Sequence, residues 1–220
     1  HGNPLSFGPM RFQLQHVGNA FAWVFFGILP FVFAPQFLDP VRYPQLMLIG
    51  VGCLLLLGFI FTYKTKVATP QNPTSTKFWW LALPLAGWTA LSMIWALNAA
   101  EAWFTFVHLS LCLSFFHLAR KALAEIPDLL FKVVKALIVS MGLLAILGLL
   151  QWLGFDPLKT GDQQNSAMGT MTNPNFYADA LLLGLPFCIY GLVKFPDKLW
   201  KILAAITISL ILAGIAVSKA

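Results

Sequence analysis

Seven apolar runs, each about as long as a membrane-spanning helix, constrain this chain more than any other feature of its sequence. Roughly 20 apolar residues in a helix cross the core of a bilayer. In lipid only a helix or a closed barrel satisfies every backbone hydrogen bond, and the continuous, non-alternating runs exclude a barrel. The sequence therefore predicts an all-α fold, a polytopic transmembrane bundle with spans near residues 19–38, 45–63, 78–97, 102–118, 136–153, 176–193 and 200–217.

The composition excludes an ordinary soluble domain. Hydrophobic residues make up 59% of the chain and charged residues 10%, whereas a soluble domain carries about 25% charged residues. The net charge of +6 is not gathered in one patch, so we expect no nucleic-acid partner. Cys53, Cys112 and Cys188 lie far apart inside apolar runs, which is typical of buried thiols and predicts neither a disulfide framework nor a metal site.

The distribution of Lys and Arg predicts the orientation. The loops after the second, fourth and sixth runs hold three, four and three basic residues, and those after the third and fifth runs hold none and one. Loops rich in Lys and Arg stay in the cytoplasm. We therefore expect a cytoplasmic N-terminus, with the hairpin at Asn98, the loop 154–175 and Lys219 on the outer face.

The chain has no Pro-, Gly- or Ser-rich linker and no repeat of fixed period, so residues 10–220 are predicted to form a single transmembrane domain. We expect residues 1–9 to be a remnant of added or upstream sequence, because Met10 makes a natural start. The last run is followed at once by Ser-Lys-Ala (218–220), which favours an incomplete domain.

A polar, turn-rich stretch, Gly-Thr-Met-Thr-Asn-Pro-Asn at 169–175, meets the sixth apolar run within one residue. Pro174 restricts Asn173 to extended geometry, and Asn175 is predicted to cap the helix that follows. A helix N-terminus presents free N–H groups and a partial positive charge, which is a natural site for an anion. A well-capped helix start with no ligand is the alternative.

Two further polar residues are expected near this stretch. Asp179 lies one turn into the sixth run, and an acid inside a membrane segment usually faces a cavity or a partner. A first-turn acid that reaches water and is favoured by the helix dipole is the other reading. Gln151, at the outer end of the fifth run, could reach the same region.

Lys219 follows the seventh run and either extends to the interface or lies beside a phosphate-bearing lipid. His108 and His117 are nine residues apart, on roughly opposite faces of a helix, and we assign them no catalytic role. The sequence contains no P-loop, Gly-x-Ser-x-Gly or His-Glu-x-x-His motif. We expect no metal and no cofactor.

The stretch 169–176, followed by an apolar run that ends in Leu185-Pro186, resembles the Gly-Thr-Phe-x-Asn-Pro-Asn segment of the O-antigen ligase/polymerase superfamily. Three weaker similarities occur in the same order as in that family. They are Gly-Leu-Leu-Gln (148–151), Ser-Met-Ile-Trp-Ala (92–96) with Asn98 and Glu101, and Ser-Lys-Ala (218–220) where the family often has Ser-Arg-Gly.

The resemblance covers residues 92–220 and implies the N-terminal portion of an integral membrane glycosyltransferase. Members of the family have about a dozen spans in the bacterial inner membrane. At the periplasmic face they transfer a glycan from a polyprenyl-diphosphate carrier to a lipid, polysaccharide or protein acceptor, without a metal. The expected partners are membrane lipid, the donor and the acceptor. The resemblance implies substrate-binding roles for Asn173, Asn175, Lys219, Asp179 and Gln151.

Two departures from the family matter. Lys219 stands where an arginine is expected, which keeps the charge but loses bidentate geometry on phosphate. The family's catalytic arginines and histidine lie largely in a later periplasmic loop, so the catalytic residues are not identified in this chain. The competing hypotheses are a transporter or flippase-like carrier of a lipid or polyisoprenoid, and a structural membrane subunit. Polar residues that cluster at one face disfavour the transporter.

Overall fold

The computed structural model describes residues 16, 18–32, 34, 41–64, 76–126, 128–158 and 167–218. All regular elements in these ranges are helices, which confirms the predicted all-α class. Four of the described helices are long and apolar enough to cross a membrane, and shorter apolar helices accompany them. The four are Ala99–Leu123, Leu129–Trp152, Pro174–Lys194 and Lys198–Val217. The count of seven spans and the cytoplasmic N-terminus stay predictions.

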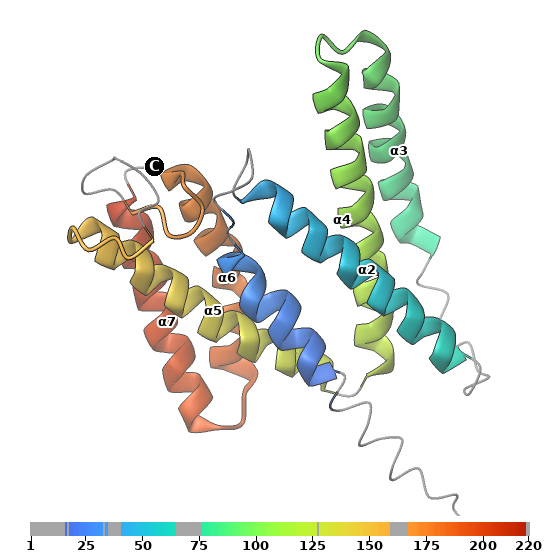
Figure 1. Cartoon of the computed structure of the whole chain (residues 1–220). Coiled ribbons are helices and arrows are strands. Elements are labelled where there is room, and N and C mark those ends of the chain that lie inside the picture. Colours follow the sequence, from blue (N-terminus) through green and yellow to red (C-terminus); the bar gives the residue numbers. More distant parts are fainter. Residues whose placement is uncertain are drawn as a thin grey trace, which may run out of the picture. The chain divides into compact units, whose positions relative to one another are not determined.

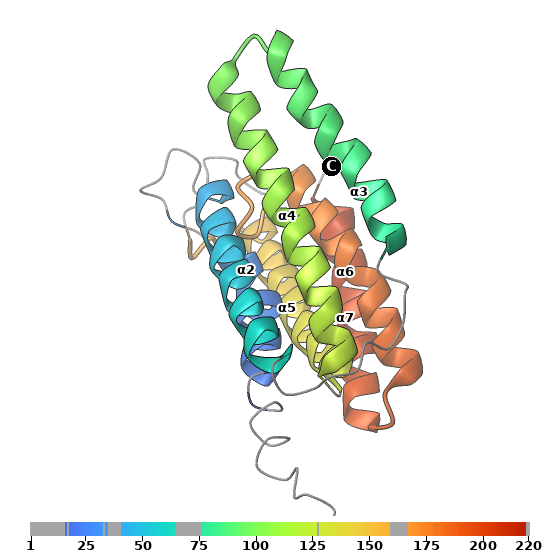
Figure 2. The ribbon, with the colours of Figure 1, turned by 90° about the vertical axis from the view of Figure 1, so that its right-hand side faces the viewer.

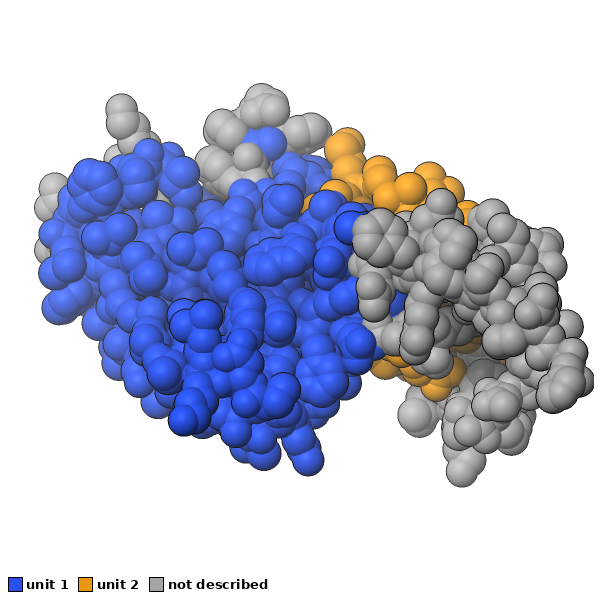
Figure 3. All heavy atoms as spheres, turned by 90° about the horizontal axis from the view of Figure 1, so that it is seen from below, with its two compact units in different colours: residues 1–45, 126–220 blue, residues 46–125 orange. Residues whose placement is uncertain are grey.

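The chain divides into two compact units, which Figure 3 draws in blue and orange. Residues 1–45 and 126–220 form the first unit, and residues 46–125 form the second. The single domain predicted for residues 10–220 stays a prediction. The elements of the first unit are η1 (Trp23–Ile28), η2 (Leu29–Phe31), α5 (Leu129–Trp152), α6 (Pro174–Lys194) and α7 (Lys198–Val217).

Helix α5 is the centre of the first unit and packs against α6, α7 and η1 (Figure 1). Its apolar stretch is 56% buried, against 33% for α6 and 22% for α7. Small residues bring the helices close together: Gly142 faces Thr207 of α7, whose hydroxyl donates to the Ile138 carbonyl at 3.3 Å. Such close packing and interhelical hydrogen bonding associate helices in lipid, where the hydrophobic effect between them is weak.

The side chain of Tyr177 fills the space between α5, α7 and the loop before α6. It is fully buried, and its hydroxyl donates to the Ala145 carbonyl at 3.2 Å. Glycines from three segments surround it: a Cβ added at Gly148 would overlap the ring, a Cβ at Gly169 would lie 2.8 Å from a ring carbon, and a Cβ at Gly214 would lie 2.6 Å from the hydroxyl oxygen. These three positions have no room for a side chain while the ring is in place.

The first helix ends earlier than predicted. We expected a span to residue 38, but the first helix, Gly18–Phe31, becomes a π-helix at Trp23–Ile28 and ends in a 3-10 turn, Leu29–Phe31. Pro35, where we also expected a kink, lies outside the described residues. Pro30 explains both features, because its ring clashes with the carbonyl four residues earlier and it has no N–H to donate. Val32, which follows the turn, is already extended.

Most of α2 (Arg42–Lys64), together with α3 (Thr76–Ser92), η4 (Met93–Trp95) and α4 (Ala99–Glu125), belongs to the second unit. Figure 2 shows α3 and α4 side by side as a hairpin. We predicted a hairpin turn at 98–101, but the non-helical residues are 96–98 and α4 begins at Ala99. The Asn98 side-chain oxygen accepts from the Glu101 N–H at 3.2 Å. Cap geometry therefore starts α4 one turn earlier than the apolar run does.

Helices α4 and α5 also extend beyond the predicted spans 102–118 and 136–153. The charged stretch 120–135, expected to be a connection, is helical up to Glu125 and again from Leu129, and Asp128 before the second helix has a left-handed φ of 59°. Bilayer thickness limits the apolar part of a helix but not the helix itself, since Lys and Arg are good helix formers beyond the lipid.

The packing around Tyr177 predicts that Gly148→Ala destabilises the protein by about 1–3 kcal/mol, because an overpacked methyl group forces the ring to move. Gly87→Ala is the control: an added Cβ there has nothing within 4 Å. On an exposed helix that change is neutral or stabilising by up to about 1 kcal/mol. Thermal unfolding in detergent measures both, and equal midpoints would contradict the steric role of Tyr177.

Candidate functional site

The candidate site lies where the loop 167–173 meets the C-terminal end of α5 and the N-terminal end of α6. Ala167, Met168 and Thr170 of this loop are buried. Gly169 has a φ of 57° and Thr172 a φ of 56°, so two residues of this loop adopt the left-handed conformation. The left-handed region strains most side chains but suits glycine, which also leaves room there for Tyr177.

Gln151 clamps the buried half of the loop. Its side-chain oxygen accepts from the Met168 N–H at 3.1 Å and the Gly169 N–H at 2.6 Å. Its amide nitrogen donates to the Gly169 carbonyl at 2.9 Å and to Asp156 at 3.1 Å. The residue is 4% exposed. The prediction that Gln151 reaches this region is confirmed, but its polar atoms are engaged by protein groups.

A hydrogen bond from another residue connects the loop to the first helix. The Thr170 hydroxyl donates to the Pro30 carbonyl. This carbonyl belongs to the 3-10 turn that ends the helix, where the last carbonyls have no partner within the helix itself. Thr170 thus satisfies a carbonyl at the helix end and fixes the loop to it.

Asn173, and not Asn175, caps α6. The Asn173 backbone is extended, and its side-chain oxygen accepts from the Asn175 N–H at 2.8 Å. Pro174 is the first residue of the helix, where its fixed φ and missing N–H cost nothing. The predicted cap at Asn175 is therefore wrong by two residues, and the helix begins at Pro174 instead of Phe176. The Asn175 side chain is exposed on the first turn.

This cap reduces what the helix end could give to an anion. A helix leaves four N–H groups without partners inside it. Of these four, Pro174 has no N–H and the Asn175 N–H donates to the cap. At most two, those of Asn173 and Phe176, remain for a ligand. A phosphate at this end would need side-chain donors as well, and the exposed Asn175 amide is one.

A groove of about 440 Å³ lies beside the loop 167–173 and the first half of α6. Apolar side chains from η1, η2, α5, α6 and the loop 167–173 form its walls, and Asp179 and Gln45 bring the polar groups. Among the residues the structure describes, the exposed Asp179 carboxylate has no hydrogen-bond partner or cation. The walls are Phe25, Phe26, Leu29, Pro30, Leu137, Met141, Met171, Phe176, Ala180, Leu183, Gly184 and Phe187.

The predicted site residues thus fall into two groups, those whose polar atoms are bound by protein groups and those whose polar atoms are exposed. Gln151 and Asn173 hold the loop and start the helix. Asn175 and Asp179, four residues apart on one face of α6, keep exposed polar side chains. Lys219 lies outside the described residues. Within those residues, no three His, Cys, Asp or Glu side chains gather in a group that could hold a metal ion.

Sequence reasoning missed Tyr177 and Thr170. A single aromatic residue in an apolar run has no pattern that marks it as buried under a loop. The available signal was the pair Gly148 and Gly169, because glycines at a helix end and in a loop leave space that a large side chain such as Tyr177 fills.

No protein-family model matches this sequence, and the comparisons with curated proteins and with solved structures found no match either.

The clamp predicts that Gln151→Leu opens the loop. Two buried N–H groups lose their acceptor, and each unsatisfied group costs about 1–3 kcal/mol. Amide hydrogen exchange at Met168 and Gly169 should become at least about tenfold faster, since about 1.4 kcal/mol corresponds to a factor of ten. Ser209→Ala, which removes an exposed side-chain hydrogen bond within α7, should leave this exchange unaltered. Unaltered exchange in Gln151→Leu would contradict the clamp.

The cap assignment predicts a difference between the two asparagines. Asn173→Ala removes the side-chain acceptor and should lower the free energy of unfolding by about 1 kcal/mol. Asn175→Ala, which removes an exposed amide on the first turn, should change it by less than about 0.5 kcal/mol. Thermal or denaturant unfolding of both variants measures the difference, and the reverse order would restore Asn175 as the cap.

Proposed function

We propose that this chain takes part in an O-antigen ligase-like transfer of a glycan from a polyprenyl-diphosphate carrier. In such a transfer an acceptor hydroxyl attacks the first carbon of the sugar. A glycosidic bond forms as the bond between that carbon and the diphosphate oxygen breaks, and the hydroxyl loses its proton. The polyprenyl diphosphate leaves with the bond's electron pair.

The observation that carries the proposal is the groove beside α6, apolar along its walls and polar near the start of the helix. Its volume of about 440 Å³ lies within the range of about 300–1,000 Å³ that is usual for ligand sites. Aromatic and aliphatic walls suit a polyprenyl chain, which has no hydrogen bonds to make. The polar end lies next to the motif that resembles the family.

The charges at the polar end favour one placement of the donor, with its sugar near Asp179 and its diphosphate near Asn175. A carboxylate is an acceptor only, so Asp179 would repel a diphosphate and accept hydrogen bonds from sugar or acceptor hydroxyls. The Asn175 amide can donate to the diphosphate from one turn away. We propose Lys219 as the cation that offsets phosphate charge, with Gln151 and Asn173 holding the loop and helix end that position these groups.

The same proposal includes the topology. Seven spans with a cytoplasmic N-terminus would place the loop 167–173 at the outer face, which is the periplasmic face of a bacterial inner membrane. The distribution of Lys and Arg supports this orientation. An acceptor lipid or polysaccharide would then meet the donor outside the cytoplasm, where the carrier presents its glycan.

The proposal predicts that Asp179→Asn lowers glycan transfer by about tenfold or more, because a hydrogen bond to a charged group contributes about 1.5–3 kcal/mol. Asn175→Ala should lower it as well. Transfer is measured in membranes that contain the full-length protein, as the fraction of acceptor that gains glycan on a gel. Asp197→Asn is the matched control: Asp197 caps α7 at the other end of α6, and asparagine caps equally well.

Unchanged transfer in both Asp179→Asn and Asn175→Ala would overturn the proposed site. Carrier movement across protein-containing vesicles without any glycan transfer would instead support the transporter hypothesis and overturn the proposed reaction.

A further inference from the structure

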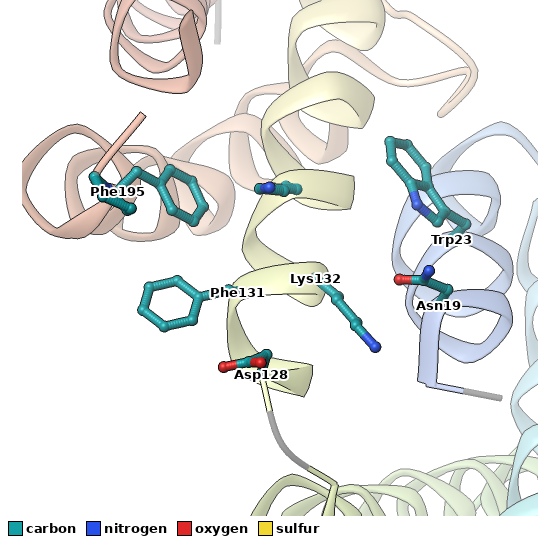
Figure 4. Close-up of a pocket in the computed structure, with 8 residues that line it drawn as sticks. Asn19, Trp23, Asp128, Phe131, Lys132 and Phe195 are labelled. Carbon is teal, nitrogen blue, oxygen red and sulfur yellow. The ribbon is translucent and has the colours of Figure 1, made fainter. Parts of the chain in front are cut away.

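A second cavity lies at the other end of α5, away from the loop 167–173. Its volume is about 470 Å³, and it is lined by residues of the first helix, of the N-terminal end of α5 and of the segment that follows α6 (Figure 4). The lining residues are Asn19, Trp23, Asp128, Phe131, Lys132, Lys135, Phe195 and Pro196. The function proposed above uses none of them.

Aromatic rings hold one of its two lysines in place. The Lys135 ammonium lies 4.8 Å from the centre of the Trp200 ring and 5.7 Å from that of the Phe195 ring. Phe195 in turn packs against Phe131 and Trp200, with ring centres 5.6 and 6.1 Å apart. Cation–π contacts restrict the ammonium without neutralising its charge, so it remains able to bind an anion.

The second lysine extends to the other side of the cavity. Figure 4 shows Lys132 directed from α5 towards the first helix, which carries Asn19 and Trp23. The Asn19 side chain adds amide donors to the same space. Two cations and an amide from two helices thus line one cavity, as the phosphate of a lipid headgroup requires.

Among the residues that the structure describes, lysines outnumber acids at this end. Asp128 also lines the cavity but is exposed at its edge, so the lining carries two positive charges and one negative charge. Of the described residues in and beside the α6–α7 connection, Lys194, Lys198 and Lys201 are basic and Asp197 is acidic. The local field therefore attracts anions into the cavity.

We propose that this cavity binds the phosphate of an anionic phospholipid, with Lys132 and Lys135 as its cationic contacts. Basic pockets between membrane helices, where the apolar spans end, bind the headgroups of such lipids. Trp23, Phe131 and Phe195 add amphipathic and apolar surface for the upper part of the acyl chains, which a free phosphate would not need. The site is independent of the proposed glycan transfer.

The test is a calorimetric titration of the delipidated full chain, in a neutral detergent, with three probes. Dihexanoyl-phosphatidylglycerol is expected to bind, whereas dihexanoyl-phosphatidylcholine and inorganic phosphate should bind at least tenfold more weakly. The double variant Lys132→Gln/Lys135→Gln should lose at least tenfold in affinity for the anionic lipid. Lys132→Arg/Lys135→Arg keeps both charges and should lose less than threefold.

The matched control is Lys198→Gln/Lys201→Gln, which removes two charges from the same end but none from the cavity lining. It should weaken binding by less than threefold. An equal loss in both Gln doubles would show attraction by net charge alone and overturn the proposal. Phosphate binding as tight as the lipid would mean a free-anion site, and equal binding of the neutral lipid would mean an acyl-chain site; either result overturns it too.

Discussion

The position of the Tyr177 ring determines how the three helices of the first unit meet. The ring comes from the first turn of α6 and lies against Gly148 of α5, Gly214 of α7 and Gly169 of the loop. Its hydroxyl must have a partner in this dry space, and the Ala145 carbonyl accepts its proton. Because one side chain touches all these segments, the loop, the helix start and the approach of α7 form one packed arrangement.

Apolar runs of bilayer length were enough to predict the helical class and most helix positions, because lipid leaves the backbone few alternatives. They did not locate helix ends, which caps and charges decide. The sequence Asn-Pro-Asn offers two possible caps, and the preference of proline for the first helical position favours Asn173. That rule was available from the sequence alone and would have corrected the assignment to Asn175.

Sequence patterns predicted which polar residues lie near the loop, but not which of their polar atoms are bound by protein groups. Gln151 and Asp179 were both expected near the loop, yet Gln151 is enclosed by backbone groups and Asp179 faces a groove. A sequence shows that a polar residue is near a helix end. Whether protein groups engage its atoms depends on the fold of segments such as the first helix, which contributes Pro30 from far away in sequence.

The hydrogen bonds of the loop also bear on how a ligand could arrive. The hydrogen bonds of Gln151 and Thr170 hold the loop in place, and the loop covers the Tyr177 side chain. The groove, by contrast, has walls such as Leu183, 74% exposed, on a helix surface that faces lipid in a membrane. The proposed lipid-linked donor would enter sideways from within the bilayer leaflet. Its supply to Asp179 would then follow its two-dimensional density in the leaflet and not its concentration in water.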